Sequence, residues 1–412
     1  MTHELLSPPP WTLIPFITLL LFIALAPLFW GHFWEKHKSK GLIAFLCSIP
    51  TLIYFGKEFH PLLHSLEDYF SFMCLIGSLF IISGGISIEG DFKAKPQTNT
   101  LFLALGAVLA SLIGTTGASM LLIRPFLKTN SERKITWHQP LFFIFIVSNF
   151  GGLLTPLGDP PLFLGYLNGV PFRWTFSLLP EWCISISLLL TLFFIWDSIT
   201  YRKENLQDLI RDEKEQSPLK IQGIFNFILL GGVIGSIFLH SPWREILMIG
   251  ISLISFFKTP QKIHRYNQFN FNPIIEVGIL FLGIFITMTP VLQYLQFHAP
   301  NLNITQPWQF FWSSGILSSF LDNAPTYLTF FNIAKGLHSS GGIAGVPEHL
   351  LQAISVGSVF MGANSYIGNG PNFMVKAIAD EQGFKTLSFG AYLFMSTVIL
   401  WPIYLLFTWL FF

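Results

Sequence analysis

Long apolar runs separated by short polar stretches follow one another along the whole chain. Many of them approach the length of about 20 residues that an α-helix needs to cross a bilayer. The runs cover residues 13–30, 42–55, 69–86, 100–126, 141–167, 176–196, 221–239, 246–257, 273–295, 308–333, 351–375 and 387–412. This pattern predicts an all-α polytopic membrane protein that lies in a lipid bilayer.

Two of these runs are interrupted by polar residues near their centres. The sequence GTTG at 114–117 divides the run at about 100–127, and DNAP at 322–325 divides the run at about 308–336. The resulting arms of about 10 to 14 residues are too short to span a bilayer. We expect each run to form a re-entrant helical hairpin. A single kinked spanning helix is the alternative from the local sequence alone.

The distribution of basic residues favours the hairpins. Lys and Arg accumulate in cytoplasmic loops, and the loop after the first interrupted run holds four basic residues between 124 and 134. A hairpin keeps this loop on the same side as Lys93 and Lys95, whereas a full crossing would place it on the opposite side. The chain is therefore expected to have about ten crossings and two hairpins.

The expected elements occur in the same order in two halves of the chain. Residues 1–200 and 221–412 each hold five crossings and one hairpin, and the polar segment 201–220 is the expected cytoplasmic linker. The first hairpin opens to the cytoplasm and the second to the outside, which predicts an inverted repeat. Transporters with this architecture place their sites near the midplane, where broken helices of both halves meet.

The two expected broken helices contain the densest polar clusters. The helix at about 141–167 includes SNFGGLLTPLGDPPLF, and the helix at about 351–375 includes GANSYIGNGPNFMVK. Proline removes backbone hydrogen bonds from a helix, and non-helical backbone at membrane depth is tolerated only inside protein or beside a watery cavity. We therefore expect both clusters at a shared polar centre.

Composition and charge exclude several other classes of protein. Of the 412 residues, 52% are hydrophobic and 11% are charged, against about 25% charged in a soluble domain. The formal charge of +1 gives no basic field for a nucleic-acid partner. The three cysteines show no metal-binding or disulfide spacing. These features predict a multi-pass protein of the cell (inner or plasma) membrane without a bound cofactor.

Two carboxylates fall near the inferred membrane centre, Asp159 and Asp322. An ionisable group there costs at least ~2.5 to 3.5 kcal/mol unless partners or water compensate it. A Gly-Asp-Pro turn in a surface loop is the alternative for Asp159, but the apolar run around it is too long for a loop. With oxygen ligands nearby, Asp159 and Asp322 are expected to bind Na⁺ in competition with protons.

Further polar residues are expected to complete this ion site. The candidate oxygen ligands and neighbours are Thr115, Thr116, Asn149, Thr155, Asn323, Asn364 and Asn369. Glu276 begins an apolar run, where it is either a proton-relay carboxylate or an interface residue that reaches water.

Four motifs together resemble the NhaD-type sodium:proton antiporters. The motifs are TPLGDPPLF, GTTGASMLLIRP, LDNAPTYLTF and GANSYIGNGPNFMVKAIAD, and the likeness extends over about residues 72–394. This family belongs to an ion transporter superfamily that also contains citrate and dicarboxylate carriers. The resemblance implies a homodimer in which each subunit has a scaffold and a mobile transport domain that works by an elevator-like movement.

The predicted function is therefore exchange of sodium or lithium for protons. The alternative is a sodium-coupled carrier of citrate or another organic anion, for which Arg124 and Lys376 are the only nearby cationic candidates. The superfamily's Ser-Asn-Thr tips are absent here, which weakens that alternative. An intramembrane aspartyl protease is disfavoured because Pro156 stands where the first Gly of its GxGD motif would be. We expect no enzymatic activity.

Overall fold

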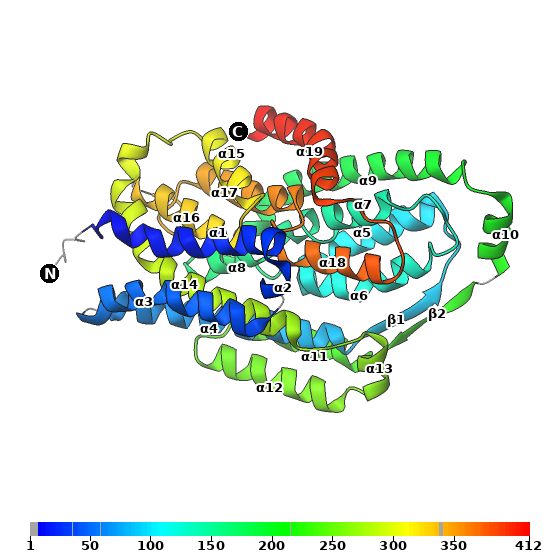
Figure 1. Cartoon of the computed structure of the whole chain (residues 1–412), viewed down its shortest axis with the longest axis horizontal. Helices are drawn as coiled ribbons and strands as arrows, with labels where there is room; N and C mark the ends of the chain where they lie inside the picture. Colours follow the sequence, from blue (N-terminus) through cyan, green and yellow to red (C-terminus); the bar gives the residue numbers. More distant parts are fainter. Residues whose placement is uncertain (1–6, 35, 58, 215, 338–340) are drawn as a thin grey trace.

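The computed structural model describes residues 7–34, 36–57, 59–214, 216–337 and 341–412, and most of them are helical (Figure 1). The α-helices are α1 (Leu13–Phe29), α2 (Gly31–Trp34), α3 (His37–Tyr54), α4 (His60–Gly84), α5 (Pro96–Ile113), α6 (Thr115–Lys128), α7 (His138–Ile146), α8 (Pro160–Leu167), α9 (Leu179–Tyr201), α10 (Leu206–Lys214), α11 (Phe225–Ser236), α12 (Trp243–Lys258), α13 (Gln261–Tyr266), α14 (Asn272–His298), α15 (Pro307–Ser318), α16 (Asn323–Gly336), α17 (Glu348–Met361), α18 (Gly370–Glu381) and α19 (Phe389–Phe411). The short 3-10 helices are η1 (Pro10–Thr12), η2 (Phe55–Lys57), η3 (Phe150–Leu154), η4 (Phe172–Leu178), η5 (Ala299–Leu302) and η6 (Gly362–Asn364).

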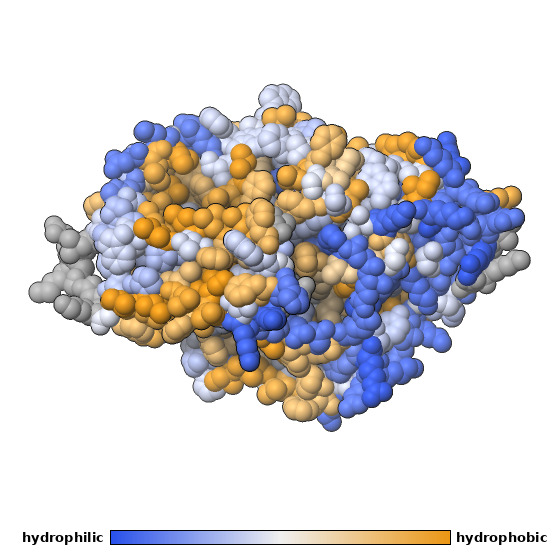
Figure 2. All heavy atoms as spheres, viewed as in Figure 1, coloured by the Kyte–Doolittle hydropathy of each residue, from blue (hydrophilic) through white to orange (hydrophobic). Residues whose placement is uncertain are grey.

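Several helices have the length and composition of membrane spans. Within the described ranges, six stretches qualify: Pro10–Pro27, His60–Gly84, Pro96–Ile113, Phe172–Tyr201, Asn272–Leu302 and Phe389–Phe411. Hydrophobic residues cover much of the visible face, while hydrophilic residues gather around the end that holds α10 (Figure 2). The expected class of helical membrane protein is confirmed at this level. The ten crossings and two hairpins stay predictions.

Both interrupted runs form two helices that pack against each other. Gly114 has a φ of +81° between α5 and α6, a conformation that glycine adopts without steric cost. In the later run, Asp322 precedes α16 with a φ of −55° and ψ of 139°, so the chain cannot continue as one helix. The first arm is longer than expected: α5 begins at Pro96 and has 18 residues, because its polar first turn is also helical.

A two-stranded antiparallel ribbon was not anticipated from the sequence. Strand β1 (Ser87–Asp91) connects α4 to α5, and β2 (Ser217–Gln222) connects α10 to α11. The ribbon lies at the same end of the molecule as α10 (Figure 1). Part of the expected linker 201–220 is therefore ordered structure, although its residue 215 lies outside the described residues.

Candidate functional site

Asp159 lies directly before α8, and the local sequence keeps its carboxylate away from that helix. Its backbone is extended, with φ −143° and ψ 144°, and the side chain makes no capping hydrogen bond. Pro160 and Pro161 occupy the start of the helix, so neither can offer the backbone N–H that usually binds a capping carboxylate. The residue is only 1% exposed, so groups elsewhere in the chain must stabilise its carboxylate.

Three neutral side chains from three separate segments bind this carboxylate. Thr115 Oγ1, at the start of α6, donates to Oδ1 at 2.8 Å, and Asn369 Nδ2, just before α18, donates to the same oxygen at 3.2 Å. Asn323 Nδ2, at the start of α16, donates to Oδ2. The backbone N–H of Thr115 also donates to the carbonyl of Gly158 at 2.8 Å, which fixes the position of α6 beside the segment. The carboxylate thus sits where both interrupted runs and both broken helices meet.

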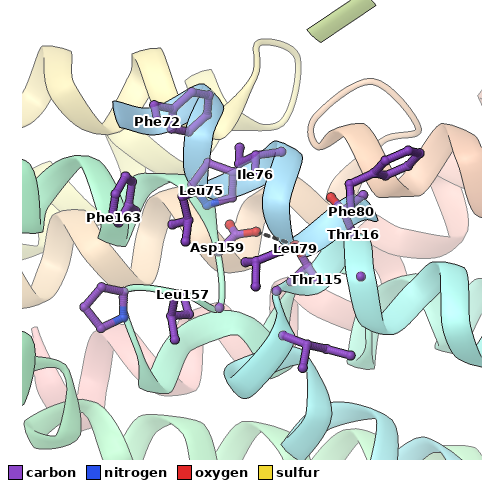
Figure 3. A pocket seen from close by; sticks show the side chains of 16 residues that line it. Phe72, Leu75, Ile76, Leu79, Phe80, Thr115, Thr116, Leu157, Asp159 and Phe163 are labelled. Carbon is purple, nitrogen blue, oxygen red and sulfur yellow. Dashed lines mark hydrogen bonds between the residues drawn. The ribbon is translucent and has the colours of Figure 1, made fainter. Parts of the chain in front are cut away.

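A small cavity adjoins Asp159 (Figure 3). Apolar side chains of α4, among them Phe72 and Leu79, form one wall, and Thr115 and Thr116 add hydroxyl groups. Its volume is about 30 Å³, enough for about two water molecules or a dehydrated ion. Asp159 is the single ionisable side chain among the lining residues.

The segments around Asp159 and Asn369 have the same backbone course, 210 residues apart. Asn369 is extended like Asp159, with φ −150° and ψ 140°, and it also directly precedes a helix. Each segment includes a short 3-10 helix that ends at a hydroxyl residue. Thr155 (φ −140°, ψ 155°) ends η3, and Ser365 (φ −139°, ψ 167°) ends η6.

Equivalent hydrogen bonds hold the two segments. The hydroxyl of Thr155 donates to the carbonyl of Ser111 in the last turn of α5, and the hydroxyl of Ser365 donates to the carbonyl of Ser319, directly after α15. In both segments a backbone N–H two residues later donates to the same hydroxyl at 3.2 Å. The two segments also touch through an aromatic pair: the rings of Phe150 and Phe360 stack with centroids 4.0 Å apart and an interplanar angle of 15°.

Some residues expected in the ion site make hydrogen bonds to the backbone and side chains around it. Asn149 Nδ2 donates to the carbonyl of Ile144 and to Asn372 Oδ1, and Asn149 Oδ1 accepts from Asn369. Asn364 Nδ2 donates to Ser319 Oγ at 2.8 Å, so it joins the second broken helix to α15. Together with Thr155, these residues position the segments and make no contact with the Asp159 carboxylate that the structure records.

Asp322 and Glu276 lie apart from the hydrogen-bonded cluster. The half-buried Asp322 caps α16, where its Oδ1 accepts from the backbone N–H of Ala324 at 3.1 Å. It influences Asp159 by charge but makes no recorded hydrogen bond to it. The Glu276 carboxylate is 40% exposed and pairs with Lys40 of α3 at 2.5 Å. The structure therefore does not bring the two aspartates into direct contact.

The sequence analysis missed two features of this region. Ser111 and Ser319 were not singled out. The offset of 210 residues that matches Phe150 with Phe360, Gly158 with Gly368 and Asp159 with Asn369 places Leu321, not Ser319, opposite Ser111.

The second missed feature is a buried ion cluster near the ends of α7 and α9. Asp197 Oδ1 lies 2.7 Å from Arg133 Nη1 and 2.8 Å from His138 Nε2, with all three side chains at most 1% exposed. No sequence motif indicated this pairing. It ties the loop after α6 to α9, and none of its members lines the cavity.

Comparison with known proteins adds the class of function. A family model described as "Putative citrate transport" matches residues 6–412, nearly the whole chain. The chain belongs to this family. No curated protein matches it. Membership in the citrate transport family, together with the apolar helices, identifies a membrane transport protein. The narrower resemblance to NhaD-type antiporters is not tested by this match.

Proposed function

We propose that this protein exchanges Na⁺ or Li⁺ for protons and that Asp159 binds the two kinds of cation in turn. One observation carries the proposal: a buried carboxylate faces a cavity of about 30 Å³ and receives hydrogen bonds from neutral groups alone. An ionised carboxylate buried without a positive partner is costly, and either a proton or a small cation removes that cost. Because both would occupy the same oxygens, binding of one displaces the other.

The surrounding oxygen atoms suit a dehydrated alkali cation. Thr115 and Thr116 bring hydroxyl groups to the cavity. The amide oxygen Oδ1 of Asn323 is buried near the carboxylate and has no hydrogen-bond partner among the described residues. Asp322 adds negative charge from the start of α16 and attracts a cation without touching Asp159. Hydroxyl, amide and carboxylate oxygens are the ligands that hard cations prefer.

The proposed architecture follows from the matched segments. We infer an inverted repeat of residues 1–200 and 221–412, in which the α5–α6 and α15–α16 pairs are re-entrant hairpins. The equivalent hydroxyl bonds of Thr155 and Ser365 support this interpretation. A homodimer in the cell membrane, with an elevator-like movement of the part that holds Asp159, completes the proposal. These last points rest on the resemblance to NhaD-type antiporters.

A sodium-coupled citrate carrier is the second candidate, favoured by the family match. The site gives it less support, since the cavity is far smaller than a tricarboxylate and no lining residue is basic. The two cationic candidates are also engaged elsewhere: Arg124 Nη2 donates to Gln268 Oε1 at 2.8 Å, and Lys376 Nζ lies 2.5 Å from Asp380. A carboxylate in the cavity would repel an anion unless a bound cation came first.

Proteoliposomes distinguish the candidates. We expect Na⁺ and Li⁺, but not K⁺ or citrate, to dissipate a preformed pH gradient, with half-saturation at higher Na⁺ as the pH falls because protons compete for Asp159. Asp159→Asn should reduce this exchange to the rate of empty vesicles. The matched control is Asp208→Asn, whose carboxylate pairs with Lys134 outside the site, and it should retain the wild-type rate.

Two results would contradict the proposal. Unchanged exchange by Asp159→Asn would remove this carboxylate from the mechanism. Saturable uptake of labelled citrate that depends on Na⁺, without Na⁺-driven proton movement, would establish the second candidate instead.

A further inference from the structure

Asn369 occupies the position in the second half that Asp159 occupies in the first. Both residues directly precede a helix, both have extended backbones, and both are at most 2% exposed. Their side chains meet, since Asn369 Nδ2 lies 3.2 Å from Asp159 Oδ1. The chain thus places an amide where a second carboxylate would stand beside the first.

We propose that Asn369 makes this site selective for monovalent over divalent cations. The inference rests on the proposed cation site at Asp159 and concerns its charge. A monovalent ion balances one carboxylate, whereas a divalent ion would leave an uncompensated positive charge buried in an apolar environment. Sites for divalent cations usually collect several carboxylate oxygens, and a neutral amide at position 369 withholds one such group.

The orientation of the Asn369 amide supports this role. Its Nδ2 donates to the carbonyl of Ser148 at 3.1 Å and to Asn149 Oδ1 at 3.2 Å, in addition to Asp159. The two hydrogens of this NH₂ group are shared among three acceptors, which fixes the amide with its nitrogen toward Asp159. The residue therefore supplies a donor, and not a second anionic oxygen, at this point of the site.

Asp322 does not take the place of the missing carboxylate. Its Oδ1 binds the N–H of Ala324 at the start of α16, where it serves as the helix cap, and it does not line the cavity. Among the described residues, no group of three or more His, Cys, Asp or Glu side chains is placed to hold a metal ion. Asp159 is the one carboxylate among the residues that line the cavity, so it is the one that an ion there would contact.

Equilibrium binding to the purified full-length protein tests the inference, with Mn²⁺ as the divalent probe. For the wild type we expect Na⁺ and Li⁺ to raise the melting temperature in detergent. Mn²⁺ at equal ionic strength should have no effect that depends on Asp159. Electron paramagnetic resonance should detect one bound Mn²⁺ per chain of Asn369→Asp, with an affinity at least about tenfold higher than that of the wild type.

Two control variants complete the experiment. Asn168→Asp makes the same chemical change at the other end of α8, where the Asn168 amide donates to the carbonyl of Leu164, and it should not gain Mn²⁺ binding. The double variant Asp159→Asn with Asn369→Asp moves the single carboxylate to the second half. It should lose the gained Mn²⁺ binding and retain stabilisation by Na⁺.

Either of two results would overturn the inference. One is wild-type protein that binds Mn²⁺ at least as tightly as Na⁺ and loses this binding on Asp159→Asn, which is measurable even where Asn369→Asp fails to fold. The other is folded Asn369→Asp protein with no gain in Mn²⁺ affinity. Failure of the proposed antiport is separate, because wild-type protein that binds Na⁺ selectively without Na⁺-driven proton movement would contradict the exchange and leave the selectivity intact.

Discussion

The segments that end at Asp159 and at Asn369 have the same backbone but different chemistry. In both, a hydroxyl residue receives the N–H two residues later, a 3-10 helix precedes it, and a short helix follows. The side chain before that helix is a carboxylate in one segment and an amide in the other. The elements that maintain the backbone are thus duplicated, while the charge is present once.

The tips of the two interrupted runs share one role but differ in both backbone and side chains. Thr115 and Asn323 both begin a helix and both donate to Asp159, one through a hydroxyl and one through an amide. Before them stand Gly114, with a positive φ, and Asp322, which caps its helix. The two tips thus share a donor to the carboxylate, although the residue before that donor has φ +81° in one tip and φ −55° in the other.

The largest effect is expected at the glycines that both segments share. A Cβ at Gly158 would lie 2.1 Å from the carbonyl oxygen of Gly152, and one at Gly368 would lie 2.5 Å from that of Gly362. Because backbone must shift, Gly158→Ala and Gly368→Ala should each destabilise the fold by about 3 kcal/mol or more. The measurement is the yield and melting temperature of folded protein in detergent.

Gly370→Ala is the matched control, since a Cβ there meets nothing within 4 Å. Its melting temperature should remain at the wild-type value. Equal tolerance of alanine at Gly158 and Gly370 would show that the close approach of the Gly152 carbonyl to the backbone of Gly158 is not required.

A smaller effect is expected at Asp322, which stands in the second tip where the first tip has Gly114. Asp322→Ala should cost about 1 kcal/mol of stability because Ala324 N loses its acceptor, whereas Asp322→Asn retains a capping oxygen and should melt near the wild type. Both variants should weaken apparent Na⁺ affinity by a similar factor, because both remove the charge. If Asp322→Asn abolished exchange as Asp159→Asn does, the ion would have two essential carboxylates.

The contact between the two segments can be measured directly. Phe150→Leu, Phe360→Leu and the double variant form a cycle, in which the stacked rings should show a coupling energy of about 1 kcal/mol. Denaturation in mixed detergent gives the four stabilities, that of the wild type included. Additive effects would indicate that the rings contribute by burial alone.

The smallest effect is expected outside both segments, at Glu276. Its partner is Lys40, and its carboxylate is 40% exposed, so Glu276→Gln should leave the Na⁺ dependence of exchange within about twofold of the wild type. Transport assays at several Na⁺ concentrations test this expectation. A selective loss of proton movement in this variant would restore Glu276 as a relay.

Local chemistry explains what the sequence could predict. Pro156, Pro160 and Pro161 prevent a continuous helix wherever the chain places them, so the break around Asp159 could be predicted from that segment alone. Gly114 and Asp322 likewise marked the starts of α6 and α16. The class of membrane protein followed from the apolar runs, and the family match agrees with a transporter.

Long-range contacts account for what could not be predicted. The donation from Asn369 to Asp159 joins residues 210 positions apart, and no local pattern indicates which Asn of the second cluster faces the carboxylate. The pairing of Asp197 with Arg133 and His138 depends in the same way on helix packing. Glu276 could not be assigned because Lys40, its partner, lies on another helix.

The β1–β2 ribbon has a topological consequence. Ser87 pairs with Gln222, so the chain enters and leaves the stretch from α5 to α10 at one place, through two strands joined by backbone hydrogen bonds (Figure 1). Any displacement of these helices relative to α4 and α11 must bend both connections together. The rate of deuterium uptake by the amides of β1 and β2 would therefore report on that displacement.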